Sequence, residues 1–149
     1  MTTIATMLRK VESVNLRQEV PKIIQQTSFE IVAYNQAQLY SGITAKGERI
    51  SPRYRSAPYA QEKAKMNSKP GLGIPDLRLT GAFYSSINVT VENEKIDIDS
   101  FSPRGAELKR KYGESILGLT ESNRSKYANT VVFDGIKKYV SGKTGLKFS

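Results

Sequence analysis

Two aspartates, Asp97 and Asp99, are the residues whose types and spacing come closest to a catalytic or metal site. They lie two positions apart in an alternating segment, so both side chains would project from the same face of a strand. Carboxylate oxygens placed in this way can bind a divalent cation. However, the sequence supplies no clear third ligand or general base beside them. Charged residues on an exposed strand also keep it soluble and discourage edge-to-edge pairing, and we prefer that interpretation.

The composition removes most other catalytic chemistry. The chain of 149 residues contains neither histidine nor cysteine, so it lacks the usual general base near neutral pH and the imidazole and thiolate ligands of zinc sites. Gly142-Lys143-Thr144 resembles the end of a phosphate-binding loop, but Lys137 stands where that motif needs its first glycine. We therefore expect no enzymatic activity, no cofactor and no metal site.

The net charge points to a polyanionic neighbour. The chain carries a formal charge of +9 and has a sequence pI near 9.8, a balance common among proteins that contact nucleic acid. A solvated basic face, or a basic rim that docks an acidic protein, would explain the same charge. No apolar run approaches the length of a membrane span, so we expect no membrane partner.

Basic residues gather in two segments that we expect to face DNA or a partner. Tyr54 and Tyr59 are interleaved with the first group, and aromatic and cationic side chains together can bind a single nucleic-acid strand. We prefer a plainer interpretation, in which the tyrosines anchor a lysine-rich loop and its short helix, residues 59–66, on the body of the protein. The candidate basic residues are Lys46, Arg49, Arg53, Arg55, Lys63, Lys65, Lys69, Lys109, Arg110 and Lys111.

The clearest structural pattern lies between residues 87 and 101. Apolar and polar residues alternate before and after Asn93-Glu94, which predicts two antiparallel strands joined by a two-residue turn. That turn would place Val91 opposite Ile96 and Val89 opposite Ile98. A hairpin alone is not stable in water, so helices before and after it must cover its apolar face.

Helical patterns flank the hairpin on both sides. We predict a short amphipathic helix within residues 1–14, a long helix over 18–40, a short helix over 77–86, a basic helix over 104–112 and a last helix from Thr120 to Gly142. The long helix is apolar on more sides than one small sheet can cover, which suggests that a neighbouring subunit covers the rest. The side chains expected at this subunit interface are Phe29, Ala33, Leu39 and Tyr40.

Together these patterns predict a single α+β domain spanning residues 1–149. The long helix and the C-terminal helix should pack on a small antiparallel sheet. Residues 43–75 should form a long basic loop, and residues 142–149 a flexible tail.

Three segments resemble the neck and tail-completion (virion morphogenesis) proteins of tailed bacteriophages. They are the loop over residues 47–65, the stretch over residues 77–87 and the Ile116–Thr120 link before the last helix. They occur in the order expected for that family. The residues that carry the motif are Leu79, Thr80, Gly81, Phe83, Ser86, Leu117, Gly118 and Leu119.

The resemblance implies a structural role. A member of this family would form a homo-oligomeric ring in the neck or tail of the virion, between the portal or connector and the tail-tube or tail-terminator proteins. Double-stranded DNA would pass it without sequence-specific contact, and the subunit would be made in the cytoplasm of the bacterial host. The alternative is a stand-alone basic protein that binds nucleic acid through the loop over residues 46–69.

Overall fold

The computed structural model describes residues 3–148 and is an α+β structure dominated by helices. Its main elements, in chain order, are α1 (Ile4–Glu12), α2 (Leu16–Gln26), α3 (Ser28–Tyr40), α4 (Ala57–Met66), α5 (Ala82–Ser85), β1 (Ile87–Glu92), β2 (Lys95–Ser100), α6 (Pro103–Tyr112), α7 (Glu121–Tyr127) and α8 (Phe133–Thr144).

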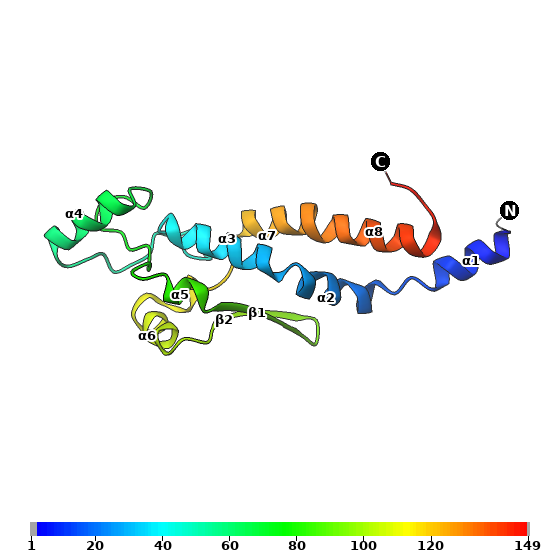
Figure 1. Cartoon of the computed structure of the whole chain (residues 1–149), viewed down its shortest axis with the longest axis horizontal. Coiled ribbons are helices and arrows are strands. Elements are labelled where there is room, and N and C mark those ends of the chain that lie inside the picture. Colours follow the sequence, from blue (N-terminus) through cyan, green and yellow to red (C-terminus); the bar gives the residue numbers. More distant parts are fainter. Residues whose placement is uncertain (1–2, 149) are drawn as a thin grey trace.

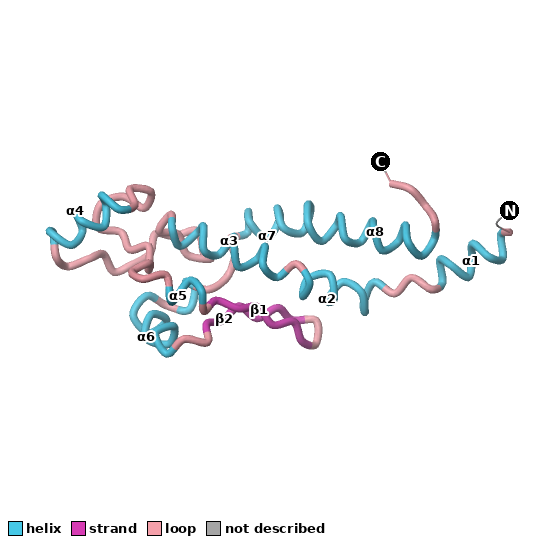
Figure 2. The backbone as a smooth tube through the Cα atoms, in the orientation of Figure 1, coloured by secondary structure: helices cyan, strands magenta, loops and turns pink. Residues whose placement is uncertain are grey.

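The molecule is elongated, and three layers run along its length (Figure 1). The consecutive helices α2 and α3 form the middle layer, with α7 and α8 along one side and the hairpin on the other. Helix α4 stands at one end of the long axis and α1 at the other (Figure 2). The ends of the chain are therefore far from the loop segment that carries most of the predicted basic residues.

The hairpin has the predicted register. Val91 pairs with Ile96 and Val89 with Ile98, and both turn residues, Asn93 (φ 48°) and Glu94 (φ 65°), adopt the left-handed conformation of a tight hairpin turn. The apolar face is covered unequally, because α2 and α3 pack over β1. Val89 is consequently buried, whereas Ile96 on β2 remains 46 % exposed.

The long helix predicted over residues 18–40 is wrong as a single element, because it divides at Thr27. The Thr27 hydroxyl donates to the carbonyl of Ile23 (2.7 Å) and also hydrogen-bonds the Tyr127 hydroxyl (2.7 Å). A β-branched residue that bonds the preceding turn in this way often bends a helix. The bend separates α2 from α3, and the hydrogen bond to Tyr127 joins this point of the chain to α7.

The last helix begins at the predicted N-cap but ends later than predicted. Thr120 accepts a hydrogen bond from the N–H of Asn123 (3.2 Å), and a π-helical turn over Ala128–Val132 joins α7 to α8. The stop at Gly142 is wrong, since the helix continues to Thr144 and ends at Gly145, which has a left-handed φ of 75°. Residues 142–144 of the predicted tail thus belong to the helix, while Ser149 lies outside the described residues.

The helix predicted over residues 77–86 is also wrong over most of its length. The Asp76 carboxylate accepts the N–H of Arg78 (3.0 Å), which turns the chain two residues on. Leu77 has a positive φ of 57°, and only the last turn, α5, is helical. By contrast, the basic helix predicted at 104–112 is confirmed as α6, with Gly113 as its C-cap.

The segment predicted as a long basic loop also contributes to the core. Ser56 caps α4 by accepting the N–H of Tyr59 (3.3 Å), which confirms the predicted short helix. Ile50 and Ile74, on either side of that helix, are buried.

The apolar core consists of two adjoining clusters. The first joins α3 to the segment before α4, to α5 and to the start of β1; the second joins α3 to β1 and α7. Their buried members are Leu39, Ile50, Phe83, Tyr84, Ile87 and Ile116 in the first, and Ile31, Val89, Leu119 and Tyr127 in the second.

Candidate interaction surfaces

One residue of the aspartate pair is engaged in contacts within the fold. Both residues lie on β2, but Lys109 of α6 binds the Asp99 carboxylate (2.9 Å), which also accepts the N–H of Ser100 (2.8 Å). The hydrogen bond from Lys109 holds the pKa of Asp99 below its usual value. Within residues 3–148, no group of three acidic side chains gathers around a common point. Asp99 therefore fastens α6 to the hairpin, and Lys109, predicted to face DNA or a partner, has an internal role.

A second ion pair lies in the interior, between Lys63 of α4 and Asp76. Their Nζ and Oδ1 atoms are 2.8 Å apart and both side chains are more than nine-tenths buried. Lys63 also donates to the carbonyl of Arg78, and Asn67 donates to Asp76 (3.0 Å). The prediction that Lys63 faces DNA or a partner is therefore wrong, because its side chain is buried and paired. The carboxylate is needed there, since a buried ammonium without a partner is costly.

The electrostatics around Asp76 follow from this packing. Burial raises the pKa of its carboxyl, but the hydrogen bonds from Lys63, Asn67 and the N–H of Arg78, together with the charge of Lys63, outweigh burial and lower the pKa overall. Burial, followed by the negative charge of Asp76, raises the pKa of Tyr54 and of Tyr84. Asp76 is thus ionised and both tyrosines are neutral at physiological pH.

Several of the other predicted basic residues are bound to their own surroundings. Arg49 donates to the carbonyl of Pro70 (2.6 Å), and Lys65 pairs with Glu62 (3.3 Å). Two more lie over tyrosine rings: Lys69 over Tyr40 at 5.4 Å, and Lys111 over Tyr112 at 5.2 Å. These four residues are nevertheless exposed, as are Lys46, Arg53, Arg55 and Arg110.

Arg53 and Arg55 lie in a groove that the sequence did not predict. It has a volume of about 680 Å³ and runs between the loop before α4 and one side of α6. The rings of Tyr54 and Tyr59 meet edge to face, with centroids 4.9 Å apart. We call this surface the basic groove; its lining residues are Pro52, Arg53, Tyr54, Arg55, Tyr59, Arg104, Glu107, Leu108, Lys111 and Tyr112.

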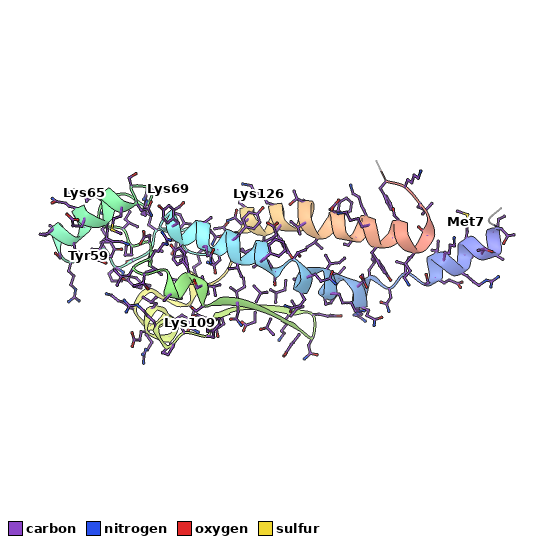
Figure 3. All side chains as sticks on the ribbon, viewed as in Figure 1. Met7, Tyr59, Lys65, Lys69, Lys109 and Lys126 are labelled. Carbon is purple, nitrogen blue, oxygen red and sulfur yellow. The ribbon has the colours of Figure 1, made fainter. Side chains whose placement is uncertain are left out.

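Four cations and one carboxylate line the basic groove, so it suits an anionic ligand. Figure 3 shows Tyr59 near one end of the long axis and Met7 of α1 near the other. Tyr54 is half-buried and Tyr59 is exposed, and both rings line the basic groove.

The four residues predicted at a subunit interface do not lie on one surface. Leu39 is fully buried in the first core cluster, so its assignment to the interface is wrong. Tyr40 is half-buried, packs against the same cluster and lies under Lys69. Phe29 and Ala33 are exposed, and Phe29 is the larger apolar side chain, at 65 % exposure. The packing of α3 in the core thus buries one of these side chains and leaves Phe29 and Ala33 in solvent.

Several exposed apolar side chains lie on α1, α2 and the hairpin tip, and others, such as Met66, Leu72 and Phe101, lie elsewhere on the surface. A groove of about 410 Å³ separates α2 from the tip, and we call it the apolar groove. A second apolar hollow shares Ile24 and Ile96 with it and continues toward Val132 beside α8. The lining residues of the apolar groove are Leu16, Arg17, Val20, Pro21, Ile24, Val91, Glu94 and Ile96.

Two buried amides, missed from sequence, hold the link before the last helix. Asn35 donates to the carbonyl of Ile116 (3.0 Å) and accepts the N–H of Gly118 (3.1 Å). Gln38 donates to the carbonyl of Gly118 (2.9 Å) and accepts the N–H of Thr120 (2.9 Å). The sequence did contain a signal for this role, because the two amides lie three residues apart within an apolar helix. Amides buried in such a helix need hydrogen-bond partners elsewhere in the chain.

The residues that carried the family resemblance occupy structural positions. Gly81 has a φ of 89° and precedes α5, Phe83 is in the core, and Ser86 hydrogen-bonds the Ser100 hydroxyl (2.5 Å). Leu79 and Thr80 are exposed, and the Leu117–Leu119 link is the segment that Asn35 and Gln38 hold. These residues thus form the base of the hairpin and the entry to the last helix.

Comparison of the chain with protein-family models, with curated proteins and with solved structures found no match. Over residues 3–148, none of the helices combines the length and the apolar character needed to cross a membrane.

Proposed function

We propose that this protein is a structural subunit of a tailed-phage virion, a neck or tail-completion protein that forms a homo-oligomeric ring around the DNA channel. Its neighbours would be the connector or portal on one side and the tail-tube or tail-terminator protein on the other. Its role would be structural, and it would need neither catalytic activity nor a cofactor.

The observation that carries the proposal is the incomplete burial of the hairpin. Its sheet has two strands only, and a two-stranded sheet gains stability from packing against something else. Helices α2 and α3 cover β1, while Ile96 on β2 and the side chains of the apolar groove remain open. A contiguous apolar surface of this kind is typical of an interaction site. Together with the family resemblance, it favours self-association.

The test is the mass of the purified chain as a function of protein concentration and salt. Ring formation predicts a concentration-dependent shift from monomer to one closed oligomer in light scattering, with annular particles in negative stain. Since copies with a charge of +9 repel one another, added salt should strengthen association. A chain that stays monomeric at every concentration and salt would contradict the proposal.

The basic groove favours a second candidate, a stand-alone nucleic-acid-binding protein. Its cations and tyrosines are suited to phosphate contacts and base stacking. Binding to DNA would weaken as salt rises, the opposite of the salt effect expected for ring formation.

A charge-matched comparison separates the candidates. Arg53→Gln with Arg55→Gln removes two charges from the basic groove, whereas Lys22→Gln with Lys126→Gln removes two exposed charges elsewhere. If DNA binding is the function, fluorescence anisotropy should show a loss of affinity in the first variant about tenfold larger than in the second. Equal, small losses would mean nonspecific attraction by net charge and would favour the ring.

A further inference from the structure

The apolar groove has a shape and lining that suit a short amphipathic helix. Its floor is aliphatic, formed by side chains of α2 and of the hairpin tip. Arg17 on the α2 wall and Glu94 on the hairpin wall reach each other across it, with Nε and Oε1 2.8 Å apart. Both side chains are mostly exposed, so this ion pair contributes little and is easily exchanged for others.

Helix α1 has an apolar stripe that its own subunit leaves uncovered. Ile4, Met7, Leu8 and Val11 recur at three- and four-residue spacing and are 42–79 % exposed. A helix of nine residues is not stable in water by itself. The stripe therefore needs a surface to pack against.

The connector after α1 directs it away from its own apolar groove. The N–H of Asn15 donates to the Tyr139 hydroxyl (3.1 Å), and that hydroxyl donates to the carbonyl of Ser13 (3.5 Å). Tyr139 belongs to α8, which lies on the opposite side of α2 from the hairpin, and α1 extends beyond the end of α2 (Figure 1). Helix α1 thus lies beyond the body of its own subunit, and its stripe stays largely exposed.

We propose that α1 of one copy docks in the apolar groove of a second copy of this chain. The inference rests on the self-association in the proposed function and names the contact that produces it. A helix passed from each subunit to the next is a heterologous contact, which closes into a ring when the rotation between subunits allows it.

Charge complementarity favours this occupant. At 100° per residue, Lys10 and Glu12 fall on opposite flanks of the apolar stripe. A docked α1 can place Lys10 beside Glu94 and Glu12 beside Arg17. The single ion pair across the empty groove would then become two pairs across the interface, while the aliphatic side chains of both surfaces become buried.

The first experiment measures oligomer mass against concentration for the full chain and two variants of equal net charge. Leu8→Glu places a carboxylate in the stripe, whereas Arg9→Gln alters the polar side of the same helix. We expect Leu8→Glu to raise the concentration needed for half-assembly by about tenfold or more, and Arg9→Gln to leave it within about twofold. Unchanged assembly of Leu8→Glu would overturn this inference but not the proposed function, while a monomeric parent chain would overturn both.

The second experiment uses the absence of cysteine from the sequence. A chain carrying Met7→Cys and Val20→Cys has one thiol on α1 and one in the groove, so mild oxidation can join only those positions. A ladder of covalent multimers on a non-reducing gel, with no dimer formed by either single-cysteine chain alone, supports docking between copies. A cross-linked monomer would show that α1 folds back into its own groove, and a lack of cross-links in a chain that assembles would place the contact elsewhere; either result overturns the inference.

Discussion

The two ends of this molecule are stabilised in different ways. At the α4 and α6 end, charged and amide side chains are buried and paired, as in Lys63–Asp76 and the contacts of Asn35 and Gln38. At the α1 end, apolar side chains are exposed, and an ion pair between Arg17 and Glu94 lies in solvent. The first end is held together by these buried polar contacts, although single apolar side chains such as Met66 and Leu79 are exposed there. The second leaves apolar surface open, which is why we assign association to it.

The largest expected effect comes from Asp76→Leu. It would leave the Lys63 ammonium buried without its carboxylate, which should reduce the free energy of unfolding by about 3–5 kcal/mol. Chemical denaturation monitored by circular dichroism measures the loss. Adding Lys63→Met should recover much of it, because the orphaned charge is then gone. A loss below about 1 kcal/mol in the single variant would mean that the α4 end does not depend on this pair.

A smaller loss of stability is expected from Asn35→Ala. This change leaves the carbonyl of Ile116 and the N–H of Gly118 without their hydrogen-bond partner. We expect a decrease of about 1–3 kcal/mol in the free energy of unfolding. The control is Gln25→Ala on the exposed side of α2, which should stay within about 0.5 kcal/mol of the parent. Similar losses in both variants would contradict the role of Asn35 in holding the link.

Acidification should weaken the α4 end by less than removal of the Asp76 side chain, because a protonated carboxyl can still hydrogen-bond. The folded-state pKa of Asp76 lies below its ordinary value of 3.8. Its contribution is therefore present above pH 3.8 and is lost as the pH falls through the folded-state pKa. The stability of Asp76→Asn, measured by denaturation from pH 6 to pH 2, should fall less steeply than that of the parent. Parallel curves would exclude Asp76 as a source of the pH dependence.

The smallest effect is expected at the α1 end. Arg17→Ala breaks an exposed ion pair, so the free energy of unfolding of the monomer should change by no more than about 0.5 kcal/mol. Thermal or chemical unfolding at a concentration where the chain is monomeric provides the measurement. A loss of 2 kcal/mol or more would show that the apolar groove is closed by this pair and that the two ends are less different than we argue.

Local patterns predicted those parts of the structure that local interactions determine. The alternation around Asn93-Glu94 gave the hairpin and its register, since a one-residue slip would turn the apolar side chains toward solvent. The N-cap at Thr120 and the basic helix before Gly113 were likewise predicted correctly. Each depends on residues within one or two turns of the chain.

The sites were predicted less well, because charge and hydropathy do not reveal a partner distant in sequence. In the sequence, Lys63 and Lys109 are cations in basic segments, as is the exposed Arg53. In the fold, however, Asp76 binds Lys63 and Asp99 binds Lys109. Phe29 and Leu39 lie on one helix, and only packing decided which became core.

The sequence by itself determined an α+β chain with a hairpin, amphipathic helices, a strong positive charge and no histidine or cysteine. The tertiary structure decided that the long helix divides at Thr27, which hydrogen-bonds Tyr127, and that α2 and α3 cover β1 more fully than β2. It also decided that the apolar stripe of α1 stays exposed. The physical reason is the range of the interactions involved. Periodicity and capping act between neighbours in the chain, whereas burial depends on which surfaces the whole fold brings together.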